Sequence, residues 1–412
     1  MKKILWVSPY SLHDTSSGAA VQCRLMLQKL AEYAKGELEI MALGSFIFDN
    51  PRGTSLFTDL KEKLAGKEQF FNLKDGLVSY VYVKNHSTFI DNHTGGEQRL
   101  FFSKFLDTLK LFKPDLIMGY GGDMLSMTMR SEAKRRGIPV VYTLWNGNHK
   151  GFTFPDCDMV LTDSRGNAAF YANNFGINVQ AGGIFIDPKH VVSPKRNPKY
   201  ITMINPVAEK GVGIFARLAL MAQKEMPEQK FLVVESRGSF AEGLAKLHVI
   251  NDTKTPKETH PLVPKMFPNV DVAQHTSDIK QVYAITKALL VPSLWFEGWG
   301  RVATEAIMNG VPVVASKSGG LPEAVSEGGI CLDAPAASKS DYNYIPTEAE
   351  VRPWMDALKK VLSEDYSANC AKAAARHQPE ISAKRVYELL KPLLDRAAST
   401  QAQFLRGGML FK

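Results

Sequence analysis

The sequence predicts two doubly wound α/β domains, each built on a largely parallel sheet with helices on both faces. Apolar runs typical of buried strands alternate along the chain with segments whose apolar residues recur at helical spacing. This alternation pauses at a polar, proline-rich stretch, residues 188–200, and then resumes. With 412 residues the chain is also too long for one ordinary core. We therefore expect domains at residues 1–187 and 201–378, joined by that linker.

The first domain is predicted to open with a strand, a loop and an amphipathic helix. The loop "YSLHDTSSGAA" separates the strand "KILWVSP" from the helix "VQCRLMLQKLAEYA". A second helix, "RLFFSKFLDTLKLF", ends before Pro114, which cannot continue a helix. Short apolar runs predict the remaining strands, which are "LEIMALG", "LVSYVYV", "DLIMGYG", "PVVYTLW" and "DMVLTDS".

The second domain shows the same alternation of predicted strands and helices. Its predicted strands are "YITMINP", "KFLVVES", "KALLVPS" and "VPVVAS". Helices are expected over about 212–224 and from Arg301 onward, with a long loop over about 253–269. Ligands of such sheets bind beyond the carboxyl ends of the strands. We therefore expect a ligand cleft where the two domains face each other.

The composition narrows the class of protein. The 45% hydrophobic and 22% charged content is that of an ordinary globular chain. Four scattered cysteines exclude a disulfide framework or a cysteine-rich metal site and fit a reducing compartment. No apolar run is long enough to span a membrane, and Pro9 interrupts the short apolar run at the start. We expect a cytoplasmic protein, with a peripheral contact on the inner face of the membrane left open.

The charge points to acidic partners. A net charge of +8 favours nucleotides, phospholipid headgroups or nucleic acid. The densest basic cluster, residues 134–136, has no interleaved aromatic side chains of the kind that single-strand binding requires. We interpret it as a solvated helix face and expect no nucleic-acid partner.

The most informative stretch is "SLWFEGWGRVATEAIMNGVPVVAS", residues 293–316. Glu297 falls in the loop after a predicted strand, and Glu305 falls about one turn inside the following helix. The main-chain amides at a helix N-terminus bind phosphate, and a carboxylate can accept hydrogen bonds from two adjacent hydroxyls. The stretch therefore offers an anion site between two carboxylates, which suits a nucleoside diphosphate sugar. The free amides are those of Gly300, Arg301 and Val302.

This stretch resembles the signature of glycosyltransferase family 4, whose members are retaining enzymes of the GT-B fold. Three further motifs agree in type and order. "SSGAA", with Gly18, resembles the glycine loop of the family, and "NPVAEKG", with Lys210, resembles its strand-end motif. "SGGLPEAV" resembles its Gly-Gly-x-Pro-Glu segment.

The resemblance implies an acceptor-side first domain, a donor-side second domain, and a final segment, residues 379–412, that crosses back to the first domain. It implies that Glu297 faces the transferred sugar, that Glu305 holds the ribose and that Lys210 grips the diphosphate. Gly18 matches a glycine whose amide contacts phosphate or acceptor. The remaining donor contacts are expected from Asn205, Gly298, Trp299, Gly300, Arg301 and Val302.

Two positions depart from the family pattern. Asn205 stands where the family has an arginine five residues before the lysine, and Arg301 or Arg237 could replace that arginine. The family also presents a histidine near the sugar from the first domain. The corresponding strand ends here offer side chains that we place on the acceptor or sugar side, namely Tyr120, Trp145, Asn146 and His149.

The sequence thus predicts a retaining transferase that moves a sugar from a UDP or GDP donor to a hydroxyl acceptor. Bacterial surface glycan, glycolipid or glycoprotein synthesis is the expected setting, with a glycan, a lipid-linked sugar or a protein as acceptor. No cofactor or metal is expected, because the one acidic pair of the metal-binding type, Asp156 and Asp158, opens a predicted strand.

Several alternatives stay open. The chain could be a catalytically weak or dead nucleotide-sugar binding module, or an epimerase on the same scaffold. A phosphorylase would need a pyridoxal phosphate lysine late in the chain, for which we find no convincing site. Trp145, Trp295 and Trp299 fit either core packing or stacking on a sugar or base.

Overall fold

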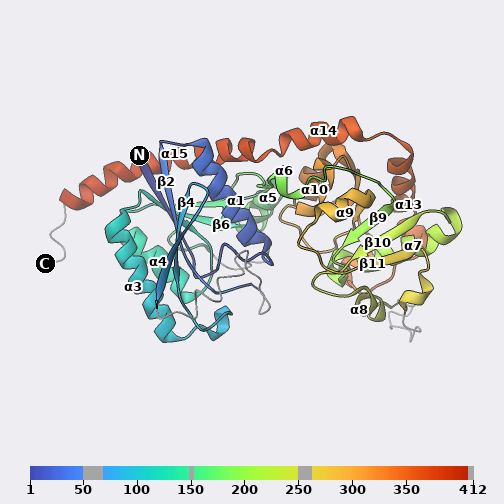
Figure 1. The fold of residues 1–412 in the computed structure, drawn as a ribbon, viewed down its shortest axis with the longest axis horizontal. Helices are drawn as coiled ribbons and strands as arrows, with labels where there is room; N and C mark the ends of the chain where they lie inside the picture. The colour runs from blue at the N-terminus through green and yellow to red at the C-terminus, as the bar shows by residue number, and fades with distance from the viewer. Residues whose placement is uncertain (50–67, 148–152, 249–261, 407–412) are drawn as a thin grey trace. The chain divides into compact units, whose positions relative to one another are not determined.

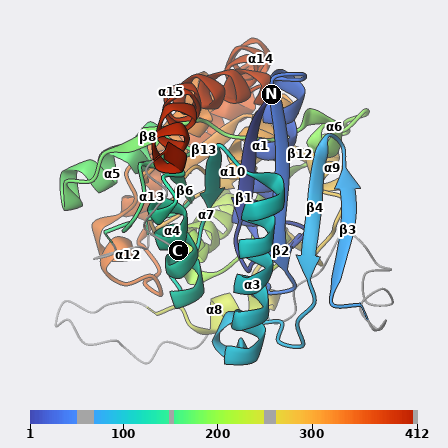
Figure 2. The same cartoon turned by 90° about the vertical axis from the view of Figure 1, so that its left-hand side faces the viewer.

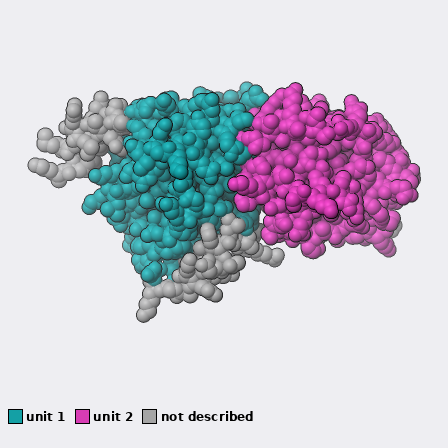
Figure 3. Space-filling model, turned by 45° about the horizontal axis from the view of Figure 1, so that its top comes forward, with its two compact units in different colours: residues 1–185, 379–412 teal, residues 186–378 magenta. Residues whose placement is uncertain are grey.

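A computed structural model describes residues 1–49, 68–147, 153–248 and 262–406, with side chains described as far as residue 396. The chain divides into two compact units (Figure 3). Unit 1 comprises Met1–Phe185 and Pro379–Lys412, and unit 2 comprises Ile186–Gln378. Each is a layered α/β structure around a predominantly parallel sheet, so the predicted fold class is confirmed.

The sheet of unit 1 has eight strands in the order β3-β4-β2-β1-β5-β6-β7-β8. Neighbouring strands are parallel except at the edge, where β3 runs antiparallel to β4 (Figure 2). The strands are β1 (Lys2–Val7), β2 (Leu38–Ser45), β3 (Phe70–Asp75), β4 (Val78–Val83), β5 (Leu116–Gly119), β6 (Val140–Leu144), β7 (Met159–Thr162) and β8 (Val179–Ala181).

Helices cover both faces of this sheet. The helices are α1 (Gly18–Tyr33), η1 (Ile90–Asn92), α3 (Gly95–Phe112), α4 (Met124–Arg135), α5 (Arg165–Phe175) and α15 (Pro379–Arg406). Ile4 and Trp6 of β1 join the core beneath α1 and α15, whereas the alternate residues Leu5 and Val7 join the core beneath α3 and α4. Helix α15 lies beside α1 (Figure 1), so this carboxy-terminal helix packs on unit 1.

The sheet of unit 2 has six strands, all parallel, in the order β11-β10-β9-β12-β13-β14. Central strands are buried on both faces, which explains their near-continuous apolar sequences. The strands are β9 (Tyr200–Ile204), β10 (Lys230–Val234), β11 (Val270–Ala273), β12 (Thr286–Val291), β13 (Val313–Ser316) and β14 (Gly329–Leu332).

The helices of unit 2 also lie on both faces of the sheet. α7 and α13 share one core with Ile201 and Met203 of β9. α9 lies on the opposite face, where Val282 packs against Leu232 and Val234. The helices are α6 (Pro188–Val191), η2 (Ala208–Lys210), α7 (Val212–Glu225), α8 (Phe240–Ala245), η3 (Pro264–Met266), α9 (Lys280–Ile285), α10 (Arg301–Met308), α11 (Leu321–Val325), η4 (Ser326–Gly328), α12 (Ala336–Ser340), α13 (Glu348–Ser363) and α14 (Ser367–Arg376).

The segment predicted as a linker is packed on unit 2. It contains the short helix α6, which the proline-rich composition concealed because proline is favourable in the first turn of a helix. Arg196 donates hydrogen bonds to the carbonyl oxygens of Thr286, at 2.7 Å, and Gly310, at 3.3 Å. Asn309 also donates to the carbonyl of Val191, at 3.0 Å. These contacts fix the segment to the ends of α9 and α10.

Candidate functional site

The predicted donor residues of unit 2 meet at the carboxyl edge of its sheet. Lys210 closes η2, a turn that follows the end of β9. Glu297 lies in the loop between β12 and α10, and Glu305 lies in the second turn of α10. Neighbouring parallel strands β9 and β12 bring these segments together, although 87 residues separate Lys210 from Glu297 in the sequence.

Glu297 and Lys210 form an ion pair. The Nζ atom of Lys210 lies 2.5 Å from Oε1 of Glu297, and the hydroxyl of Ser293 donates to the same oxygen, also at 2.5 Å. Glu297 is only 7% exposed, so these two donors compensate the loss of its hydration. The ammonium group of Lys210 also lies 4.5 Å from the centroid of the Trp295 ring, which adds a cation–π contact.

Two glycines allow the surrounding loops to approach this pair. Gly211 follows Lys210 with a φ of +81°, and a Cβ there would lie 2.0 Å from the carbonyl oxygen of Pro292. Gly319 has a φ of +55°, and a Cβ there would lie 1.9 Å from the carbonyl oxygen of Glu297. That carbonyl accepts a hydrogen bond from the amide of Gly320, at 2.8 Å. Only glycine satisfies both the positive φ and the contact.

Glu305 is held from a different helix. It is 9% exposed, and its Oε2 accepts a hydrogen bond from the hydroxyl of Tyr283 on α9, at 3.0 Å. An Nη2 atom of Arg301, one helical turn earlier, lies 3.7 Å from Oε1 of Glu305. Burial, and then the charge of Glu305, raise the pKa of Tyr283 well above its usual value. Tyr283 therefore remains a protonated donor to this carboxylate.

The other predicted donor residues lie around the start of α10. Gly300 precedes the helix with a φ of +99°, and half-buried Val302 lies in the first turn. The indole of Trp299 is packed inside unit 2, because it is 4% exposed and its N–H donates to the hydroxyl of Thr304, at 2.8 Å. Of the two interpretations of Trp299, its burial favours core packing, and stacking by its side chain is not favoured.

Asn205 immediately follows β9 and has a φ of +65°. Its side-chain oxygen accepts a hydrogen bond from the main-chain amide of Arg237, at 3.2 Å. Asparagine tolerates this left-handed conformation better than arginine does. Of the two proposed replacements for the family arginine, Arg301 lies beside Glu305, whereas Arg237 is fixed to Asn205 through its main chain.

In unit 1, Gly18 is the first residue of α1. The helix is capped by Ser17, whose hydroxyl accepts from the amide of Ala20, at 3.2 Å, and donates to the carboxylate of Asp49. A Cβ at Gly18 would meet no atom within 4 Å among the described residues. Neither packing nor φ therefore requires glycine here, which leaves the predicted ligand contact as an open explanation.

Two of the predicted acceptor-side aromatics are partly buried and pack on the core of unit 1. Tyr120 follows β5 and meets Trp6 edge-on, with ring centroids 5.5 Å apart. Trp145 follows β6, and its indole N–H donates to the sulfur of Cys23, at 3.0 Å. The carbonyl of Asn146 accepts from the hydroxyl of Tyr171, at 3.0 Å. His149 lies outside the described residues.

A buried histidine that the motifs did not single out lies in the loop before α1. His13 is 1% exposed; its Nδ1 lies 2.5 Å from the hydroxyl of Tyr82, and its Nε2 lies 3.3 Å from Asp75. Burial lowers the pKa of His13. Burial raises the pKa of Asp75, but hydrogen bonds from His13 and Arg24 outweigh it and lower the value to about 2. In the sequence, the only hint of this buried histidine was the adjacent pair "HD" in a polar loop.

Asp158, one member of the predicted acidic pair, is held by contacts within unit 1. Asp158 forms ion pairs with Lys134, at 2.8 Å, and with Arg396 of α15, and it accepts from the amide of Val140. It immediately precedes β7, one residue before the strand that the sequence predicted it to open. Within the described parts of the chain, no group of three or more His, Cys, Asp and Glu side chains could hold a metal ion.

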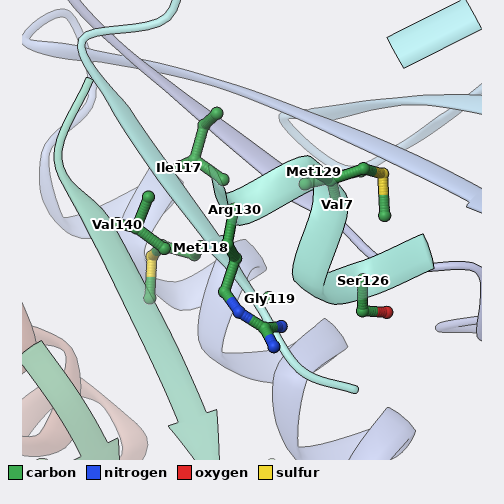
Figure 4. A pocket seen from close by; sticks show the side chains of 8 residues that line it. All are labelled: Val7, Ile117, Met118, Gly119, Ser126, Met129, Arg130 and Val140. Atoms are coloured by element: carbon green, nitrogen blue, oxygen red, sulfur yellow. The ribbon is translucent and has the colours of Figure 1, made fainter. Parts of the chain in front are cut away.

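A small cavity lies behind the end of β5, between the sheet and α4 (Figure 4). It is lined mainly by apolar side chains, including Val7, Ile117 and Met129. The guanidinium of Arg130 reaches past it to donate to the carbonyl of Gly121, at 2.9 Å, and stacks over the ring of Tyr142. Arg130 thus supports the loop that follows Tyr120.

A comparison with known families finds a match within unit 2. Residues 215–376 match the model of the family described as glycosyl transferases group 1. The matched region contains Glu297 and Glu305, whereas Asn205 and Lys210 precede it.

Named relatives match over limited lengths. D-inositol 3-phosphate glycosyltransferase of Corynebacterium kroppenstedtii is 31% identical over 126 residues, which are 30% of this chain and 27% of that protein. The enzyme of the same name from Saccharomonospora viridis is 27% identical over 188 residues, or 45% of this chain and 39% of that protein. The matches therefore span well under two thirds of the length of these relatives.

Solved structures match over nearly the whole chain. Sucrose-phosphate synthase from Thermosynechococcus elongatus has a TM-score of 0.63 and 15% identity, covering 96% of this chain and all of that one. Anabaena HepE in complex with UDP-glucose has a TM-score of 0.60 and 17% identity, covering 95% and 100%. At such identities the likeness establishes the fold, which is that of GT-B glycosyltransferases. No described helix is long and apolar enough to cross a membrane.

Proposed function

We propose that the protein is a retaining glycosyltransferase that moves a sugar from a nucleoside diphosphate to a hydroxyl acceptor. The observation that carries this proposal is the Lys210–Glu297 ion pair, which lies at the carboxyl edge of the sheet in unit 2. Glu305 follows in the next helix, and the match to group 1 glycosyl transferases covers both carboxylates. This combination supplies a cation for a leaving diphosphate and carboxylates for sugar and ribose hydroxyls.

Each group has a chemical role in this proposal. Lys210 and the N-terminus of α10 stabilise the negative charge that grows on the diphosphate as the glycosidic bond breaks. Glu297 stabilises the positive charge that develops on the sugar, without becoming a covalent nucleophile. Glu305 accepts hydrogen bonds from the ribose diol. The acceptor hydroxyl attacks on the face from which the diphosphate leaves and passes its proton to the departing diphosphate oxygen, which gives retention.

We propose a UDP sugar as the first donor to test, because HepE, which shares the fold, was solved with UDP-glucose. The acceptor would bind in unit 1, near Gly18, Tyr120 and Trp145. It would be a glycan, a lipid-linked sugar or a protein, in bacterial surface glycan or related synthesis in the cytoplasm.

The proposal is tested by incubating the protein with a panel of UDP and GDP sugars and measuring release of nucleoside diphosphate. We expect slow hydrolysis of one donor without acceptor, and much faster release when a suitable acceptor is added. The anomeric configuration of the product, read by NMR, should match that of the donor. An inverted product would contradict retention, and no release or transfer from any donor would contradict the enzymatic assignment.

A nucleotide-sugar binding module is the second candidate, and Asn205 is the observation that favours it. A hydrogen bond to a charged group contributes roughly 1.5–3 kcal/mol, so an arginine lost from the diphosphate site would weaken turnover unless Arg301 replaces it. Tight donor binding by calorimetry, without detectable turnover across an acceptor panel, would favour the module. Asn205→Arg should then raise turnover rather than lower it.

A further inference from the structure

Tyr283 contacts the proposed ribose carboxylate from outside the sequence motif. Its side chain is fully buried, and it lies on α9, which precedes β12. Its hydroxyl lies 3.0 Å from Oε2 of Glu305 and 3.2 Å from the carbonyl oxygen of Val302, both on α10. One phenol group therefore contacts both the first turn of α10 and the carboxylate in its second turn.

The geometry leaves the carboxylate available to a ligand. A carboxylate has about four lone-pair positions, and the Tyr283 hydroxyl occupies one of those on Oε2. Arg301 lies 3.7 Å from Oε1, which is outside hydrogen-bond distance. Free positions therefore remain on both oxygens for the two hydroxyls of a ribose.

The element that carries Tyr283 is itself fixed to α10. Arg196 donates to the carbonyl of Thr286, immediately after α9, at 2.7 Å, and to that of Gly310, just after α10, at 3.3 Å. The hydroxyl of Thr286 also donates to the carbonyl of Val282, at 2.8 Å. A rigid aromatic ring held in this way can fix the rotamer of the glutamate that it contacts.

We infer that Tyr283 is a positioning residue that orients the Glu305 carboxylate to recognise the 2′- and 3′-hydroxyls of the donor's ribose. This inference rests on the proposed function. It assigns to Tyr283 a share of the selectivity for ribonucleotides over 2′-deoxynucleotides. The effect is indirect, because the tyrosine hydroxyl contacts the carboxylate rather than the nucleotide.

The test compares binding of UDP and 2′-deoxy-UDP by calorimetry, with the GDP pair run in parallel, for the wild-type protein and Tyr283→Phe. We expect Tyr283→Phe to weaken binding of the ribonucleotide roughly tenfold, since it removes one hydrogen bond to a charged group. Binding of the deoxynucleotide should change less, so the ratio of the two affinities should fall. A purely structural role would weaken both nucleotides equally and leave the ratio unchanged.

Two further variants complete the design. Tyr200→Phe removes another tyrosine–carboxylate hydrogen bond of unit 2, the 2.8 Å contact with Asp271 at the opposite edge of the sheet, and should leave both affinities unchanged. Glu305→Ala should abolish the selectivity, and adding Tyr283→Phe to it should cause no further loss. An unchanged ratio in Tyr283→Phe, with selectivity lost in Glu305→Ala, would overturn this inference alone. A wild-type protein that binds neither pair would overturn the proposed function as well.

Discussion

The ammonium group of Lys210 lies 2.5 Å from the carboxylate of Glu297, and the hydroxyl of Ser293 reaches the same oxygen. Glu297 is largely buried and Lys210 is partly exposed, so Lys210 is the more accessible member of the pair. A diphosphate that approaches Lys210 would therefore meet a cation whose position is already set by Glu297. Pre-set charges of this kind cost no reorganisation during the reaction.

The first prediction separates the two tasks of Lys210. Lys210→Met should lower kcat at least a hundredfold, because the leaving diphosphate loses its cation. It should also destabilise the protein by about 2 kcal/mol, since Glu297 is left largely buried without its ion pair. Steady-state kinetics and urea unfolding measure the two effects. The double variant Lys210→Met/Glu297→Gln should recover stability and not activity, and recovery of both would contradict the catalytic role.

The second prediction uses two glycines as a matched pair. Gly319→Ala places a Cβ against the Glu297 carbonyl at a positive φ, so it should lower both the thermal midpoint and donor binding. At Gly18 an added Cβ would contact no described atom and φ is ordinary, so Gly18→Ala should shift the thermal midpoint by no more than about 2 °C. Turnover should fall if a ligand approaches the amide of this residue closely. Full activity of Gly18→Ala would argue against the ligand contact.

The elements around the site were predictable because short-range chemistry defines them. Gly300 and the Asn309–Gly310 pair mark the two ends of α10, and the structure places the helix at Arg301–Met308. Lys210 and Glu297 were also found from motifs, and the parallel pairing of β9 with β12 then brings them together. Whether they bind a nucleotide sugar stays a prediction.

Features that depend on long-range contacts could not be predicted. β3 is an antiparallel edge strand with exposed residues at alternate positions. Its sequence contains no long apolar run that would predict a strand. Tyr283 lies in an ordinary-looking helix, 22 residues from Glu305. The environment of His13 depends on Asp75, which is 62 residues away. Sequence spacing carries no information on such pairs unless the fold is known.

The third prediction concerns the pH dependence of stability. Burial lowers the pKa of His377 from its ordinary 6.5 to about 4, and its ring meets Trp299 edge-on at 5.2 Å. Its contribution is fully present above pH 6.5 and is lost as the pH falls toward 4, because the unfolded state binds the proton more readily. The loss is on the order of 3 kcal/mol.

Urea unfolding between pH 7 and pH 4 measures this contribution. His377→Gln should flatten the decline over that range, because the amide does not titrate. The control is His190→Gln, which replaces an exposed histidine of the same unit. Parallel stability curves for wild type and His377→Gln would contradict the prediction.

The last prediction is that transfer needs no divalent metal. Negative charge grows on the diphosphate as the bond to the sugar breaks, and a positive group must already be there. Lys210, Arg301 and the N-terminus of α10 supply fixed positive charge at this edge of unit 2. One member of the acidic pair that resembles a metal motif is engaged elsewhere, since Asp158 pairs with Lys134 and Arg396 just before β7.

Initial rates measured in excess EDTA should therefore equal those in magnesium or manganese, once the donor concentration is saturating. The matched variants are Asp158→Asn, which should lower stability and leave the metal response unchanged, and Lys210→Ala, which should lose turnover in every buffer. Activity that EDTA abolishes and manganese restores would overturn this mechanism. A Lys210→Ala enzyme that turns over at the wild-type rate would overturn it equally, because the cation proposed to replace the metal would then be dispensable.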